Sequence, residues 1–193
     1  MPASRDRFRQ LFTTQDLVVL ALFAAMIALS KAIFRMPIHV PGHSGITWMA
    51  ILIVGRGLVR RPWAGTVLGL VSGILAVAVV GGREGLLLWV KYLAPGMAMD
   101  LAGLLSREHL HHPFVGIVSG AVANVAKLTS SLIISLALGI PTGYLALGLG
   151  LSATTHVAFG ALGGWLGTLV LRALTRAEVP ALRTYAREEE TPR

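Results

Sequence analysis

The sequence predicts an all-α polytopic membrane protein with six transmembrane helices and both termini in the cytoplasm. Of its 193 residues, 54% are hydrophobic and 13% are charged, and the mean hydropathy is +0.71. That is more apolar surface than a soluble domain of this length can bury. The apolar residues form six runs, and arginines concentrate in alternate breaks between them. The positive-inside rule assigns those breaks to the cytoplasm.

One membrane domain over residues 16–172 takes up nearly the whole chain, between a basic leader (1–15) and a polar tail (173–193). The first span is too long for the apolar core of a signal peptide, so we expect an uncleaved helix. The net charge of +8 does not indicate nucleic-acid binding, because the charges lie in the short breaks between apolar runs. The expected spans are about 16–35, 46–58, 63–80, 85–105, 113–138 and 144–171.

The first span carries a stripe of small residues, which lets another helix approach closely. The stripe consists of Ala21, Ala24, Ala25, Ala28 and Ala32.

The segment after the first span contains Pro37, Pro41 and Gly42, which predict a loop rather than a continued helix. His39 and His43 lie in it, four residues apart. That spacing suits a metal ion on a helix, but Pro41 opposes a helix there, and no cysteine or carboxylate lies nearby to complete a ligand set. We therefore interpret the segment as a gating loop, and we expect no bound metal and no cofactor.

The later spans differ in character. The second is short and ends in arginines, and the third has glycines at strict four-residue spacing (Gly65, Gly69, Gly73), which predicts a helix-packing face. The fourth contains Pro95, which should kink it. In the fifth, small and polar residues share about a third of the helix circumference. These are Gly116, Gly120, Asn124, Lys127, Ser131 and Ser135.

Lysines and arginines are segregated along the chain. All three lysines (Lys31, Lys91, Lys127) fall inside expected spans, whereas the fourteen arginines lie in loops, in tails or near span ends. A lysine at mid-membrane depth costs at least about 2.5–3.5 kcal/mol, so a group inside the bundle must offset it. We expect that group to be an anionic ligand. The predicted substrate-binding residues are Lys127, Asn124, His156, Lys91, Tyr92, Trp89 and Ser131.

Other interpretations of these residues stay open. Lys31 and Lys91 can extend their ammonium groups to the membrane surface, and Lys127 can pair with Asp100 or with helix carbonyls. Trp89 can belong to an aromatic belt at the interface. On an ideal helix Trp89 and Lys91 point apart, so both line one pocket only if the helix is distorted.

The chain lacks the sequence motifs of the commonest catalytic sites. It has no cysteine, no G-x-x-x-x-G-K-[ST] phosphate loop, no H-E-x-x-H and no G-x-S-x-G. We therefore expect no ATP hydrolysis by the chain itself, and no enzymatic activity. A small lipid-modifying enzyme that uses His156, Lys127 and Asp100 as acid–base groups remains an alternative, as does a structural membrane subunit.

In length, in its six spans and in its first span, "LVVLALFAAMIALSKA", the chain resembles the substrate-binding S components of energy-coupling factor (ECF) transporters. The resemblance implies a prokaryotic plasma-membrane subunit that captures a small vitamin-type molecule outside the cell, beneath a lid formed by the loop of His39 and His43. It further implies that the alanine stripe docks on a transmembrane coupling subunit, which works with cytoplasmic ATPases. The spans after the third would hold the ligand.

Overall fold

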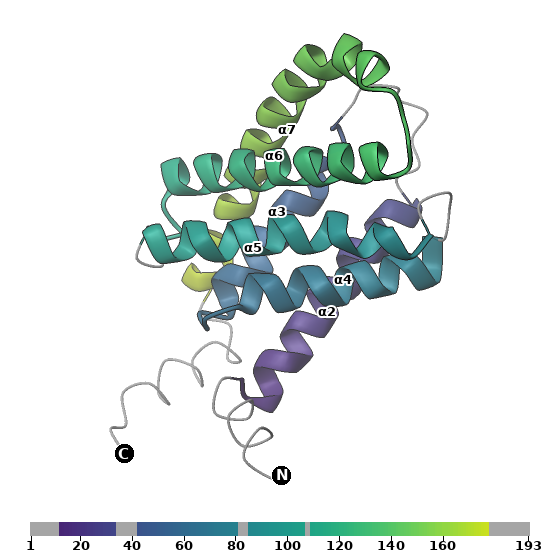
Figure 1. Cartoon of the computed structure of the whole chain (residues 1–193). Coiled ribbons are helices and arrows are strands. Elements are labelled where there is room, and N and C mark those ends of the chain that lie inside the picture. The colour runs from purple at the N-terminus through teal and green to yellow at the C-terminus, as the bar shows by residue number, and fades with distance from the viewer. Residues whose placement is uncertain (1–11, 34–41, 81–84, 107–108, 178–193) are drawn as a thin grey trace.

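The computed structural model describes residues 12–33, 42–80, 85–106 and 109–177. These residues form six α-helices, one short 3₁₀ helix (η1) and no strand, which confirms the predicted all-α fold class (Figure 1). The helices are α2 (Thr14–Ile33), α3 (Gly45–Leu58), α4 (Ala64–Val80), η1 (Gly85–Trp89), α5 (Val90–Leu105), α6 (Pro113–Ala137) and α7 (Thr142–Arg176).

Helix α3 lies at the centre of the bundle. It packs against α2, α4, α5, α6 and α7, and its residues Met49, Leu52 and Ile53 are fully buried. A helix with apolar residues on all sides is typical either of a protein core or of a membrane span, and the contacts of α3 with five other helices show that it lies in the core. The short second span is therefore the core of the molecule, around which the longer helices are arranged.

Two helix pairs approach closely along glycines. A Cβ atom on Gly69 of α4 would lie 2.5 Å from the carbonyl oxygen of Tyr92 in α5, and one on Gly65 would lie 2.7 Å from that of Gly96. On α6, Gly120 faces Gly160 and Gly164 of α7 in the same way. The glycine face of the third span is therefore used inside this chain, against α5, where backbones this close leave no room for a side chain.

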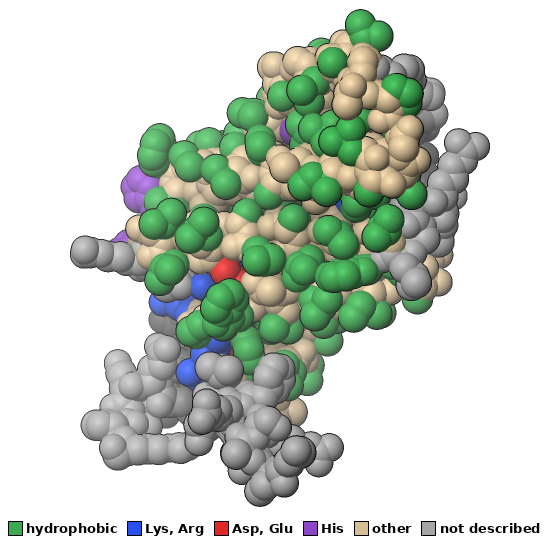
Figure 2. Space-filling view, in the orientation of Figure 1, with side chains coloured by type: hydrophobic (Ala, Val, Ile, Leu, Met, Phe, Trp, Pro, Cys, Tyr) green, Lys and Arg blue, Asp and Glu red, His purple; other side chains and the backbone are tan. Residues whose placement is uncertain are grey.

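Much of the outer surface is apolar, as Figure 2 shows for one side of the bundle. Leu22 of α2, Ile74 of α4 and Leu147 of α7 are 60%, 57% and 89% exposed, which is typical of surfaces that face lipid or a partner. By length and composition, two of the described helices are long enough to cross a membrane, Pro113–Ala137 and Leu145–Arg176. Thr14–Ser30, Gly45–Leu58 and Ala64–Val79 are apolar but shorter.

Candidate ligand-binding site

A cavity of about 70 Å³ lies between α2, α3, α5 and α6, beside the end of the loop that precedes α3. It has an apolar and aromatic wall, several hydroxyl groups and two lysines, and none of the described residues that line it is acidic. Its lining consists of Ile27, Ser30, Ser44, Thr47, Trp48, Lys91, Tyr92 and Lys127. The side chains that converge on this cavity therefore offer positive charge and hydrogen-bond donors.

The ammonium group of Lys127 is held against an aromatic wall. Its Nζ lies 4.6 Å from the centroid of the Trp48 ring and 3.3 Å from Oγ of Ser44, to which it donates a hydrogen bond. The Trp48 and Tyr92 rings lie 5.4 Å apart, tilted by 54°. A desolvated cation–π contact stabilises a lysine by about 2 kcal/mol or more, so Trp48 offsets part of the cost of placing Lys127 inside the bundle.

Trp48 also carries a buried polar atom without a partner in the described part of the chain. Its side chain is 5% exposed, and its Nε1 donates no hydrogen bond. An indole N–H left unpaired in the interior costs about 1–3 kcal/mol. Trp48 thus combines stabilising contacts with Lys127 and Tyr92 with one destabilising unpaired N–H group.

Three of the seven predicted substrate-binding residues line the cavity, namely Lys127, Lys91 and Tyr92. Trp89 does not; it ends η1, where its backbone packs against Gly73 of α4. Ser131, one turn of α6 beyond Lys127, is half-buried and lies outside the cavity lining. The 3₁₀ segment that precedes α5 places Lys91 at the cavity and Trp89 against α4.

Asn124 and His156 connect helices instead of lining the cavity. Asn124 is fully buried and its Nδ2 donates a 2.8 Å hydrogen bond to the carbonyl oxygen of His156, which joins α6 to α7. His156 Nδ1 lies 2.7 Å from the carbonyl oxygen of Ser152, and the His156 ring packs directly against Gly42, so that a Cβ there would lie 2.9 Å from Nδ1. The His156 ring therefore packs against Gly42, at the end of the loop before α3.

The predicted loop histidines and docking alanines are only partly described. His39 lies outside the described residues, and His43 is half-buried and does not line the cavity. In the alanine stripe, Ala24 and Ala28 are buried in the core of this chain, Ala21 is exposed, Ala25 is half-buried, and the side chain of Ala32 lies outside the described part. Of the described alanines of this stripe, Ala21 and Ala25 are therefore the ones with accessible surface.

Sequence reasoning missed five of the eight residues that line the cavity, namely Trp48, Thr47 and Ser44 at the start of α3 and Ile27 and Ser30 of α2. The cavity is therefore not lined by the later predicted spans alone. One signal was available in the sequence, because Trp48 comes five residues after His43. Trp48 therefore lies in the first turn of the second expected span, next to the loop that contains His43.

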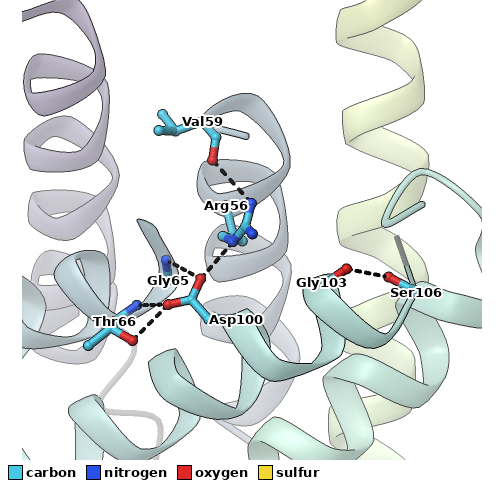
Figure 3. Close-up of polar contacts among 7 residues, drawn as sticks. All are labelled: Arg56, Val59, Gly65, Thr66, Asp100, Gly103 and Ser106. Carbon is cyan, nitrogen blue, oxygen red and sulfur yellow. Dashed lines mark hydrogen bonds and ion pairs between the residues drawn. The ribbon is translucent and has the colours of Figure 1, made fainter. Parts of the chain in front are cut away.

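Asp100 lies in a separate polar cluster (Figure 3). Its carboxylate accepts hydrogen bonds from Arg56 Nε (2.7 Å), Gly65 N (2.9 Å), and the N and Oγ1 of Thr66 (2.6 and 2.7 Å). Arg56 is 1% exposed and also donates to the carbonyl oxygen of Val59. The carboxylate thus caps the N-terminus of α4 and neutralises a buried arginine.

This arrangement bears on the alternative of an acid–base site. Among the described residues, the Asp100 carboxylate bonds to Arg56 and to α4, and not to Lys127 or His156. Over the described ranges, no three histidine, aspartate or glutamate side chains come together to hold a metal ion. The described geometry therefore offers donors for a ligand but no assembled set of acid–base groups.

The fold can be compared with known proteins. No family model and no curated protein sequence matches the chain. A solved structure, a crystal structure of an S-component of an ECF transporter, superposes with a TM-score of 0.66 and 19% sequence identity, over 94% of this chain and 100% of that one. This match shows that the chain has the fold of an ECF transporter S-component.

Proposed function

We propose that the chain is the substrate-binding subunit of an ECF-type importer, and that it captures a small anionic molecule, such as a vitamin or its precursor, outside the cell. The observation that carries this is the cavity of Lys91, Lys127 and Trp48 inside an S-component fold. Two lysines in a lining without acidic residues favour a carboxylate or phosphate. In this proposal all six helices span the membrane, the arginine-rich end is cytoplasmic, and the chain has no enzymatic activity.

The size of the cavity bears on how a ligand enters. Small-molecule sites usually measure about 300–1,000 Å³, whereas this cavity measures about 70 Å³. A vitamin-sized molecule therefore requires the wall to move. Moving Lys127 off the Trp48 ring would open the aromatic wall and free an ammonium group to meet the anionic part of the ligand. The loop before α3 would close over the ligand as a lid.

Native mass spectrometry of the gently purified chain tests the ligand. We expect a co-purifying small molecule with an acidic group, and we expect Lys127→Met to reduce its occupancy at least tenfold, because a charge-assisted hydrogen bond is worth about 1.5–3 kcal/mol. Lys127→Arg, which keeps the charge, serves as the matched control and should retain part of the occupancy. Unchanged occupancy of an acidic ligand in Lys127→Met would remove Lys127 from the site.

Uptake needs partners, and we propose that the exposed side of α2 around Ala21 and Ala25 contacts the coupling subunit. Ala21→Trp should prevent assembly with the coupling subunit and its ATPases, because a bulky side chain keeps the helices apart. Ligand occupancy of the isolated chain should not change, since Ala21 lies outside the cavity lining. Co-purification measures assembly. Turnover of a lipid by the isolated chain, without any partner, would instead support the enzyme alternative.

A further inference from the structure

A second hollow lies on the outside of the bundle, in the seam between α5 and α6. It is a groove of about 280 Å³, and ten residues line it, of which only two, both serines, are polar. They are Ala98, Leu101, Ala102, Leu105, Ser106, Phe114, Val115, Val118, Ser119 and Val122. The apolar face of α5 and α6 is visible in Figure 2.

The length of the groove matches one leaflet of a bilayer. From Ala98 to Ser106 the helix rises about 12 Å, and from Phe114 to Val122 it rises the same distance, at 1.5 Å per residue. Half of a hydrocarbon core of about 30 Å is about 15 Å. An α-helix, with a diameter of about 10–12 Å including side chains, would lie across the opening of such a groove rather than fill it. A single acyl chain is thin enough.

One end of the groove continues into a basic loop. The carbonyl oxygen of Ser106, which lines the groove, lies 2.8 Å from Nδ1 of His109. The rings of His109 and His111 lie 5.6 Å apart, and Arg172 Nε donates a 2.6 Å hydrogen bond to the carbonyl oxygen of His111. Figure 2 shows histidine side chains at this end of the α5–α6 face.

The positive charge at this end has no nearby counter-charge in the described part of the chain. Burial, His109, Arg60, Arg172 and His112 together lower the pKa of His111. The two acidic residues that the structure describes are already engaged, Asp100 with Arg56 and Asp16 with Arg61. Among the described residues neither Arg60 nor Arg172 forms an ion pair, so both present positive charge to an anion at the depth where we expect lipid headgroups.

We propose that this groove and the basic end beside it, formed by Arg60, His109, His111 and Arg172, bind one anionic glycerophospholipid. One acyl chain fills the seam between α5 and α6, and the headgroup phosphate lies against Arg172 and Arg60. Under the expected orientation the lipid comes from the cytoplasmic leaflet, whose anionic lipids attract basic segments near the surface. The site is independent of the cavity that contains Lys127.

Lipid titration of the delipidated full chain in detergent tests this, with native mass spectrometry as the readout. Phosphatidylglycerol should bind as one molecule per chain, more tightly than phosphatidylcholine, whereas glycerol phosphate, which lacks acyl chains, should not compete. Arg60→Gln and Arg172→Gln should each weaken phosphatidylglycerol about fivefold, since a basic residue near an anionic surface contributes about that factor. Arg176→Gln, which removes the same charge from exposed Arg176 one turn further along α7, is the matched control and should have no effect.

Two further measurements separate the parts of the site. Ala102 lines the groove, so Ala102→Phe should fill part of it. This variant should weaken the binding of phosphatidylglycerol and of phosphatidylcholine, while leaving the thermal unfolding temperature unchanged. Bound phosphatidylglycerol should raise the pKa of His111, measured by NMR of labelled histidines. Equal affinity for phosphatidylcholine, competition by glycerol phosphate, or unaltered binding in both Arg60→Gln and Arg172→Gln would overturn the proposal.

Discussion

Replacing Asp100 by asparagine should destabilise the bundle more than most single substitutions. The carboxylate accepts four hydrogen bonds, from Arg56, Gly65 and the two donors of Thr66. An asparagine keeps one oxygen, so its amide group faces two of these donors, and the guanidinium of Arg56, 1% exposed, loses the negative charge that lies 2.7 Å from its Nε. Removing one partner of a buried ion pair costs about 3–5 kcal/mol. At roughly 2–4 °C per kcal/mol for a chain of this size, the unfolding temperature should fall by about 6–20 °C.

Differential scanning fluorimetry in detergent measures that change, and two variants test its cause. Thr66→Val removes only one side-chain hydrogen bond and should cost about 1 kcal/mol. Adding Arg56→Met to Asp100→Asn removes the buried guanidinium together with the carboxylate that it contacts, so the double variant should be more stable than the sum of the single effects by about 1–3 kcal/mol. A fall of less than about 2 °C in Asp100→Asn would show that water already solvates this pair and would refute the reasoning.

Three further predictions follow from packing, from an unpaired donor and from a titrating histidine. Gly164→Ala should lower the unfolding temperature because its Cβ would collide with the backbone of α6, whereas Gly148→Ala, with open space around it, should stabilise α7 by about 0.5–1 kcal/mol. Trp48→Phe keeps a ring at the aromatic wall and removes the unpaired N–H, which offsets part of the cost of the smaller ring and of the weaker cation–π contact with Lys127; thermal unfolding should show a loss below the roughly 3–5 kcal/mol typical of truncating a buried tryptophan, and a loss in that range would contradict this reasoning. The folded chain holds the pKa of His111 below 6.5, so its stability should decline as the pH falls through 6.5, and denaturation at several pH values should show a smaller decline in His111→Gln.

The sequence alone was sufficient to predict the all-helical fold class, because long apolar runs and their spacing are properties of neighbouring residues in the chain. It also identified Lys91 and Lys127 as exceptional, since a lysine inside an apolar run is costly wherever the helices pack. For α6 it predicted a polar face. The helical period fixes which residues share a face, but it does not fix which helix covers that face.

Tertiary structure decided the rest. Lys127 meets Ser44 across 83 positions of sequence, and Trp48 joins them only because α3 is the central helix of the bundle. Asn124 shares the predicted polar face of α6 with Lys127, yet its amide donates to the backbone of α7 at His156, because α6 and α7 approach along glycines there. Ala24 and Ala28 belong to the same stripe as Ala21 but are buried within the chain. Contacts between distant helices depend on how whole surfaces fit together, and no local pattern in the sequence specifies that fit.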